Sequence, residues 1–299
     1  MLIVYFMEKK EVIFVIDLHV HSYYSDGTFS PEALVIQAKK RNLTAIALTD
    51  HDTIDGLSLF HQAGQKYQIE TISGIEFAAQ YNRFRNQEIH IVGLGFSLDS
   101  KTFLHQMKII TEAREARNKK MVSALNHFGF DICYDEIKQN AGGNIITRAH
   151  FANVLVKKRI VTSTSEAFEK YIGTGKPAFI ERNTLSPELC IQAIQKAGGV
   201  AVLAHPTLYQ MDYNQIEILC EELKSYGLKA IETQYSTYSK EQSTKITQIA
   251  DKLCLLYSGG SDFHGKNRPN IQIGVGKNNL NIPDTFWKEL KKQCHNNIV

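Results

Sequence analysis

The sequence has few cysteines, and none of them is placed in a pattern that marks a disulfide framework or a thiolate metal site. The five thiols are scattered, with no C-x-x-C pair: Cys133, Cys190, Cys220, Cys254 and Cys294. Isolated cysteines are typical of reducing compartments, whereas small secreted domains and structural zinc sites use paired ones. We therefore expect a cytoplasmic protein without disulfides.

Long apolar runs and a strong charge imbalance are also missing. No apolar run approaches the roughly 20 residues that cross a bilayer. The apolar start, residues 1–7, lacks the leading basic region of a signal peptide. The formal net charge is only +3, which is too small for a surface that coats DNA. We expect no membrane partner and no DNA-coating surface, whereas a small phosphorylated ligand is compatible with this charge.

Short β-branched runs alternate with helical patterns along most of the chain. The runs predict seven strands, at residues 12–16, 44–48, 69–72, 89–95, 200–204, 229–233 and 254–258. A helix over 31–41 follows the first strand, with Ser30 as its N-cap. Gly198 and Gly199 are expected to end the helix before the fifth strand. Strands that recur with helices between them predict parallel βα units in a barrel or an open sheet.

About a hundred residues separate the fourth and fifth predicted strands, far more than a usual connection. Apolar side chains recur there at helical spacing in two groups. The groups are Phe103, Leu104, Met107 and Ile110, then Met121, Val122, Leu125 and Phe128. The charged stretch 111–120 between them is expected to be an exposed helix face. We predict a mainly helical insertion at 99–190, carried by an α/β domain made of 11–98 and 191–285.

Histidines and carboxylates gather at the ends of the predicted strands. His19 and His21 follow the first strand at i, i+2, a spacing that places both rings on one face of an extended backbone. Asp262 and His264 repeat this spacing after the last strand. Four others follow or lie within intermediate strands: His51, Glu76, His90 and His205. Parallel βα folds have their active sites at the carboxyl ends of strands, so these side chains are expected to converge.

Each of these signals has an ordinary explanation when it is taken alone. A single His-x-His pair is structural or accidental about half of the time. His90 alone would be a strand histidine with a hydrogen-bond partner, Glu76 could pair with a lysine, and Asp26 could serve the turn Ser-Asp-Gly. The coincidence of so many in apolar surroundings, where unpaired polar groups are costly, indicates a metal site. Imidazole and carboxylate without thiolate suit Mn²⁺, Fe²⁺ or Zn²⁺, and the number of ligands suits two or three ions.

The segments that carry these residues follow one another in a characteristic order. They are His19-Val20-His21-Ser22, Ser25-Asp26-Gly27, Leu48-Thr49-Asp50-His51-Asp52, Gly74-Ile75-Glu76, His90, Ala204-His205-Pro206 and Gly260-Ser261-Asp262-Phe263-His264-Gly265. In this order they resemble the motifs of the polymerase-and-histidinol-phosphatase (PHP) family. The resemblance implies a distorted (β/α)7 barrel with an intact trinuclear site that binds Mn²⁺ foremost. The implied ligands are His19, His21, Asp26, His51, Glu76, His90, His205, Asp262 and His264.

Two segments of the insertion are similar to one subgroup of this family. They are Thr147-Arg148-Ala149-His150-Phe151-Ala152 and Gly173-Thr174-Gly175-Lys176-Pro177-Ala178. The subgroup removes the 3′-phosphate from nucleoside 3′,5′-bisphosphates and trims short 5′-phosphorylated RNA to mononucleotides. The resemblance implies that the insertion caps the barrel, with Arg148, His150 and Lys176 as substrate-binding residues. The alternatives are that Arg148 pairs with a surface acid and that Lys176 is merely solvated.

The implied reaction is direct hydrolysis by a metal-activated hydroxide. His205, His264 and Asp262 are the expected catalytic residues, with either histidine able to protonate the leaving oxygen. Asp17, Asp50 and Asp52 could orient ligand imidazoles, and the last two could instead cap helices. Three alternatives remain: a PHP phosphatase acting on histidinol phosphate or phosphotyrosine, a non-catalytic metal-binding accessory module, and an amidohydrolase acting on C–N bonds.

Overall fold

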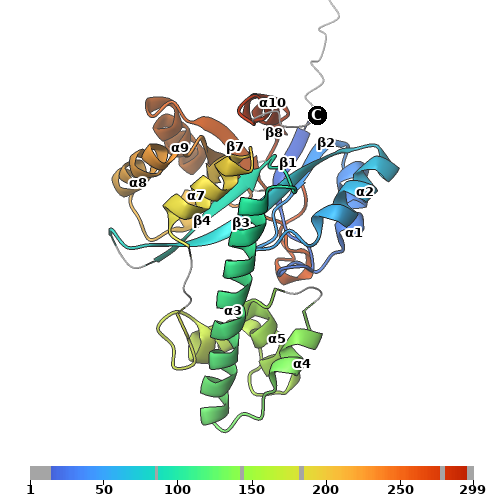
Figure 1. Cartoon of the computed structure of the whole chain (residues 1–299), viewed down its shortest axis with the longest axis vertical. Helices are drawn as coiled ribbons and strands as arrows, with labels where there is room; N and C mark the ends of the chain where they lie inside the picture. Colours follow the sequence, from blue (N-terminus) through green and yellow to red (C-terminus); the bar gives the residue numbers. More distant parts are fainter. Residues whose placement is uncertain (1–14, 85–86, 142–144, 182–184, 277–279, 295–299) are drawn as a thin grey trace, which may run out of the picture.

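The fold consists of a strongly curved sheet surrounded by helices, with a narrower helical lobe on one side (Figure 1). The computed structural model describes residues 15–84, 87–141, 145–181, 185–276 and 280–294. Its sheet has the strand order β7-β6-β5-β4-β3-β2-β1-β8. The strands are β1 (Val15–Val20), β2 (Leu43–Leu48), β3 (Glu70–Tyr81), β4 (Gln87–Leu94), β5 (Val200–Leu203), β6 (Ala230–Tyr235), β7 (Leu256–Gly260) and β8 (Ile282–Pro283). Residues 12–14 of the first predicted strand lie outside the described ranges.

The sheet curls until the ends of β1 and β7 meet. The backbone N–H of Asp262 donates to the carbonyl of His19 at 2.8 Å, and that of His21 donates to Phe263 at 3.0 Å. These bonds nearly close a barrel, as the sequence predicts. The short β8 adds an eighth strand by pairing antiparallel with β1.

The sheet is mixed, so the prediction of parallel βα units throughout was wrong for its centre. β4 pairs antiparallel with both β3 and β5, while the other long strands pair in parallel. Only residues 82–86 connect β3 to β4, which is too short for the crossover that parallel strands need. β3 is also much longer than the predicted run and contains Glu76 in its middle.

Helices pack against the strands of the barrel, most of them on its outer face. They are α1 (Pro31–Lys40), α2 (Leu57–Tyr67), α7 (Pro187–Lys196), α8 (Tyr213–Tyr226), α9 (Lys240–Lys252) and α10 (Thr285–Lys291). The main apolar core joins the sheet to α1, α2, α7, α8 and α9. Ser30 caps α1 by accepting from Ala33 N at 3.1 Å, and Gly198, with φ +81°, follows the end of α7. Both helix signals are therefore confirmed.

The lower lobe contains α4 (Tyr134–Gln139), α5 (Arg148–Lys157), α6 (Thr164–Ala167) and the π-helical turn η1 (Phe168–Ile172). Helix α3 (Lys101–His127) joins it to the barrel (Figure 1). We call residues 101–181 the cap. Phe103 and Met107 of α3 belong to the barrel core, whereas Met121 and Leu125 belong to a separate cap core. The predicted insertion extends to residue 190, but α7, which that boundary divides, packs against β3, β4 and β5.

The prediction of an exposed face over 111–120 is confirmed for one side of α3, where Glu112, Glu115, Lys119 and Lys120 are exposed, but the other side of this stretch is buried. The exposed fractions of Arg114, Arg117 and Asn118 are 6%, 7% and 1%. Arg114 forms an ion pair with Asp52 of the barrel, and the side chain of Asn118 donates to the carbonyl of Ile146 at 3.0 Å. This stretch is polar because it lies where the helix passes between barrel and cap.

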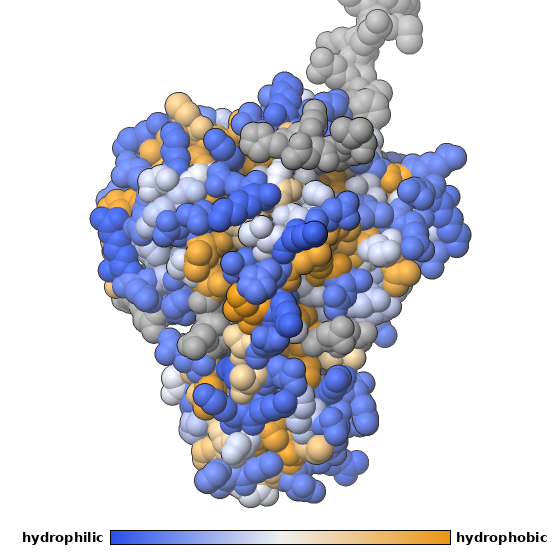
Figure 2. All heavy atoms as spheres, in the orientation of Figure 1, coloured by the Kyte–Doolittle hydropathy of each residue, from blue (hydrophilic) through white to orange (hydrophobic). Residues whose placement is uncertain are grey.

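The outer face of the cap carries mostly hydrophilic side chains with apolar ones scattered among them (Figure 2). None of the helices in the described ranges has both the length and the apolar composition needed to cross a bilayer.

Candidate metal centre

The nine side chains expected to bind metal converge at one end of the barrel. In eight of them, the ligand atoms form three groups within which all atoms lie within 4.8 Å of one another. The groups are His21, Asp26, His51 and His264; His19, His21, Glu76 and Asp262; and His51, Glu76 and His90. The ninth, His205, places Nε2 2.9 Å from Glu76 Oε1. Every two groups share a residue, so the clusters are consistent with a site for more than one ion.

Local backbone conformation turns these side chains toward one another. His205 and Asp262, just beyond β5 and β7, have φ of +28° and +55°, values that non-glycine residues rarely adopt. Asp50 fixes the loop before Asp26 by accepting from Ser22 N at 2.7 Å and from Ser25 Oγ at 2.6 Å. The barrel thus positions the centre through its strand-end loops, together with His19, Glu76 and His90 on the strands β1, β3 and β4 themselves.

The donor set fits divalent cations. Glu76 Oε2, Asp262 Oδ1 and His264 Nε2 are buried atoms without a hydrogen-bond partner in the described part of the chain. Glu76 Oε2 nevertheless lies 3.1 Å from His51 Nδ1 and 3.2 Å from His21 Nε2. His19 Nε2 and His21 Nε2 are 3.1 Å apart, a separation that requires a shared proton or a cation between them. Buried polar atoms of this kind are costly unless an ion satisfies them.

Charges within the centre keep the carboxylates ionised. Burial alone would raise the pKa of Glu76, but His90, His51 and His19 outweigh burial and hold this pKa well below its ordinary value. Burial would likewise raise the pKa of Asp262, which His264, His19 and Arg268 bring well below its ordinary value. The pKa of Asp26 is lowered in the same way, by His264 and His51 against the effect of burial. All three carboxylates therefore present negative charge to any cation that enters.

The histidines differ in their readiness to release protons. Burial lowers the pKa of His51 to about 4, so this ring is neutral near pH 7. Burial also opposes protonation of His21 and His90, but neighbouring carboxylates raise their pKa values to about 9 and about 10. Metal binding must displace these protons, because only a neutral imidazole nitrogen can be a ligand.

One supporting residue of the centre, Glu232, was not predicted from the sequence. Glu232, inside β6, lies 2.8 Å from His19 Nδ1 and accepts from the backbone N–H of His205 at 2.7 Å. It fixes the His19 ring with Nε2 toward the centre, which is the role that the sequence analysis considered for three aspartates. Asp17 instead accepts from backbone amides, those of Ser261 at 2.9 Å and Gly274 at 2.7 Å. Glu232 lies inside a strand, and no other histidine or carboxylate is near it in the sequence. Its spacing therefore does not indicate a role in the site.

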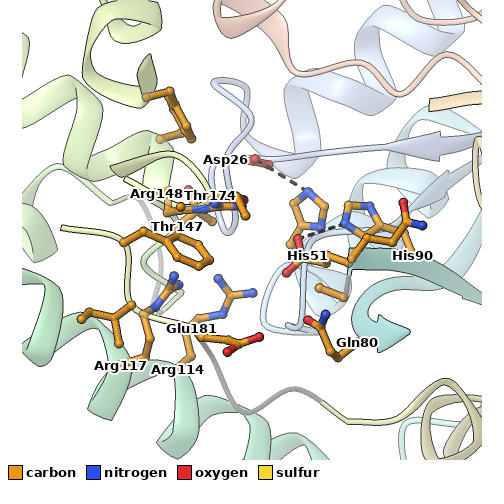
Figure 3. Close-up of a pocket in the computed structure, with 18 of the residues that line it drawn as sticks. Asp26, His51, Gln80, His90, Arg114, Arg117, Thr147, Arg148, Thr174 and Glu181 are labelled. Carbon is orange, nitrogen blue, oxygen red and sulfur yellow. Dashed lines mark hydrogen bonds and ion pairs between the residues drawn. The ribbon is translucent and has the colours of Figure 1, made fainter. Parts of the chain in front are cut away.

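A cavity of about 690 Å³ lies between the metal centre and the cap. Asp26, His51 and His90 form its barrel wall, and their side chains are 15–19% exposed, whereas His19 and His21 are fully buried. Substrate therefore meets the centre from the cap side. Arginines of the cap stand across from His51 and His90 (Figure 3): Arg114, Arg117 and Arg148.

The three residues expected to bind substrate occupy different environments. Arg148 lines the cavity. His150 is buried, and its Nδ1 accepts from Thr147 N at 3.0 Å, so that it caps α5. Burial lowers the pKa of His150. Lys176 is exposed on the turn whose neighbours Thr174 and Gly175 line the cavity.

The fold is an α/β barrel in which imidazoles and carboxylates form three overlapping groups, and arginines of the cap line the opposite wall of the cavity. These features are typical of a metal-dependent phosphoesterase. The family model for the PHP domain matches residues 17–184. The chain therefore belongs to the PHP family, and the intact donor set makes it a metal-dependent phosphoesterase of that family.

Named relatives match along nearly the whole chain. A 5′-3′ exoribonuclease from Haemophilus influenzae is 34% identical over 90% of this chain and 95% of its own length. A 3′,5′-nucleoside bisphosphate phosphatase from Chromobacterium violaceum is 32% identical over 92% and 96%. A solved structure of an amidohydrolase from Chromobacterium violaceum, with bound sulfate, superimposes with a TM-score of 0.81 at 32% identity, covering 93% of this chain and 96% of that one.

Proposed function

We propose that this chain hydrolyses the 3′-phosphate of nucleoside 3′,5′-bisphosphates and trims short 5′-phosphorylated RNA to mononucleotides. One observation carries the proposal: a single cavity joins the edge of the metal centre to Arg148 of the cap. A substrate with two phosphates can occupy both places at once. Histidinol phosphate and phosphotyrosine have only one phosphate, so neither could place a second phosphate at Arg148.

Arg148 is suited to bind the second phosphate. It forms no ion pair with any of the described residues, and it is the first residue of α5. A helix amino terminus carries partial positive charge and adds to the attraction for an anion. The guanidinium can donate two parallel hydrogen bonds to phosphate oxygens, which lysine cannot do. His150 supports this arrangement by capping the same helix, and Lys176 adds a more distant positive charge.

We propose two or three divalent metal ions as the cofactor, Mn²⁺ foremost with Fe²⁺ or Zn²⁺ as alternatives, which the nine converging side chains would hold. When bound, such ions activate water and neutralise charge on a phosphoryl group. The chain's own part is to orient the phosphate between the Asp26–His51–His90 wall and Arg148. His205 and His264 are the candidates to protonate the leaving ribose oxygen, a role for whichever of the two rings is not committed to metal, and Asp262 completes the set of catalytic residues. The free state of all five cysteines fits a cytoplasmic enzyme.

The relatives support this assignment over its rivals. An exoribonuclease and a nucleoside bisphosphate phosphatase both match over at least 90% of the chain, cap included. A non-catalytic accessory module would be expected to have lost some of these residues, whereas all nine are kept in this chain and converge, which supports a catalytic site.

A substrate comparison tests the proposal. The Mn²⁺-loaded protein is given adenosine 3′,5′-bisphosphate, adenosine 3′-monophosphate, histidinol phosphate, phosphotyrosine and a 5′-phosphorylated RNA trimer, and kcat/KM is measured for each. We expect the bisphosphate to exceed each monoester by at least about tenfold, or roughly 1.4 kcal/mol of transition-state binding. Arg148→Ala should remove most of that preference, since the preference arises from the second phosphate.

Lys157→Ala is the matched control, because it removes one positive charge from the exposed end of the same helix. It should leave the preference intact. Equal kcat/KM values for the bisphosphate and the monoesters in the unaltered protein would refute the substrate assignment, while leaving the phosphoesterase class in place.

A further inference from the structure

Two phenylalanines of the cap line the cavity beside Arg148. Phe168 begins η1, and Phe179 lies in the segment that leads out of the cap. Both are only half-buried. The guanidinium carbon of Arg148 lies 5.9 Å from the centre of the Phe168 ring and 5.4 Å from that of Phe179. The two phenyl rings and the planar guanidinium of Arg148 thus lie side by side in the wall of the cavity.

The two rings differ in what else they contact. Phe168 also packs against the cap core, so one side of it has a structural role. Phe179 belongs to none of the three apolar clusters that the described residues form, nor to the residues packed against them. An aromatic ring kept partly in contact with water in a polar cavity gains little stability for the fold. A ligand that covers this ring would bury its apolar face.

We propose that Phe179, Phe168 and Arg148 form the binding site for the substrate's nucleobase, which stacks on the rings and on the guanidinium plane. This inference rests on the proposed function, since it assigns a place to the base of the nucleotide substrate. Stacking suits every base, because each one has a π-face. Aromatic side chains and arginine planes are also the groups on which proteins stack splayed-out bases of single-stranded RNA.

The position of the rings agrees with the size and shape of a nucleotide. Asp26, His51 and His90 lie at one wall of the cavity and Arg148 at the other (Figure 3), and both phenylalanine rings lie beside Arg148. A 3′-phosphate at the metal centre therefore leaves the base and the 5′-phosphate on the cap side. A volume of about 690 Å³ is within the usual range for sites that enclose a small organic ligand.

The stacking site has a consequence for specificity. The base contributes to binding mainly through its ring area, so purines should be favoured moderately over pyrimidines. A substrate without a base should be a poor one. This tolerance of base identity is also what an enzyme requires to remove successive nucleotides from RNA of any sequence.

The test compares adenosine 3′,5′-bisphosphate with abasic ribose 3,5-bisphosphate, which keeps both phosphates. The dissociation constant of each is measured by calorimetry with metal-free protein, and kcat/KM is measured with Mn²⁺-loaded protein. We expect the adenosine compound to be favoured at least about tenfold in both measurements. Phe179→Leu, which keeps an apolar side chain but removes the ring, should bring this ratio close to one by weakening only the adenosine compound. Phe179→Trp should restore it.

Phe130→Leu is the control, since Phe130 packs against Phe128 and Tyr171 in the cap and does not line the cavity. It should leave the ratio unchanged. If Phe179→Leu weakens both ligands equally, Phe179 only supports Arg148 and the base-stacking site is refuted. Equal affinity of the unaltered protein for the two ligands would refute the site as well.

Failure of the proposed function gives a different result. If neither bisphosphate is preferred over its monophosphate, the second-phosphate site is wrong. The comparison of adenosine 3′-monophosphate with ribose 3-phosphate then still tests the stacking site, because it depends on the base alone.

Discussion

Arg268 forms an ion pair with Asp262 Oδ2, the carboxylate oxygen that faces away from the histidines. The hydroxyl of Tyr235 donates to the same oxygen at 2.6 Å. The other oxygen, Oδ1, lies 3.1 Å from His21 Nε2 and has no hydrogen-bond partner among the described residues. Arg268 and Tyr235 therefore hold Asp262, a proposed metal ligand, so that only Oδ1 is directed toward the histidines.

Removing Arg268 should loosen this ligand. Groups that orient metal ligands typically change metal affinity by about 10- to 100-fold when they are lost. We expect Arg268→Ala to weaken Mn²⁺ binding by at least about tenfold, as measured by equilibrium dialysis. Lys266→Ala, which removes an exposed cation two residues away, should have no such effect. Unchanged Mn²⁺ affinity in Arg268→Ala would show that Tyr235 and the backbone hold Asp262 without it.

Glu232 should act on His19 in a comparable way. Glu232→Gln keeps the size of the side chain but removes the negative charge beside His19 Nδ1. We expect a loss of metal affinity of about tenfold or more, because the imidazole becomes a weaker and less well oriented ligand. Glu241→Gln, on the exposed start of α9, provides the control. Metal titration followed by mass spectrometry measures both variants, and equal affinities would contradict the assignment of Glu232.

The ion pair between Arg114 and Asp52 joins the cap to the barrel. Their side chains are 7% and 1% exposed, so replacing Asp52 removes a buried carboxylate that neutralises the Arg114 guanidinium. We expect Asp52→Ala to lower the free energy of unfolding by about 3–5 kcal/mol. Glu115→Ala, which breaks the exposed pair with Lys119 on the same helix, should cost no more than about 1 kcal/mol. Urea unfolding measures both, and similar small losses would show that the interface does not depend on this pair.

The carboxylate of Glu166 in the cap should make the stability of the protein depend on pH in the acid range. Glu166 accepts hydrogen bonds from the ammonium group of Lys170 and from the backbone N–H and the hydroxyl of Thr162. These bonds lower its pKa from 4.5 to about 2. Because the folded pKa lies below the unfolded one, this stabilisation is present above pH 4.5 and is lost as the pH falls toward 2. Glu166→Gln should therefore lower the Tm at pH 7, with a smaller difference from the unaltered protein at pH 3.5. A difference that stays constant with pH would contradict the assigned pKa.

The sequence is sufficient to predict the barrel and the convergence of its histidines and carboxylates, because both depend on local signals. Runs of β-branched residues mark the strands, and His19, His51 and Asp262 stand where those strands end. The antiparallel β4 was missed, since the direction of a strand depends on connection length and pairing partners rather than on its own residues. His90 was still placed correctly on that strand, because alternation with Ile89 and Ile91 does not depend on strand direction.

The cavity wall could not be predicted, because it arises from contacts between distant segments. Arg114 and Arg117 were expected on an exposed helix face, as charged residues usually are. They are buried because α3 crosses from the barrel to the cap at that point. Glu232 and Arg268 likewise acquire their roles only when β6 and the loop after β7 are brought against His19 and Asp262.

The metal centre is tested most directly by the metal content of the chain, measured by mass spectrometry after loading with Mn²⁺ and removal of free metal. The unaltered protein should retain two or three Mn²⁺ per chain and hydrolyse adenosine 3′,5′-bisphosphate. The double variant His19→Ala with His21→Ala removes ligands from two of the three groups, so it should retain at most one ion and lose hydrolysis. Unchanged metal content and activity in that folded variant would contradict the assignment of the metal centre.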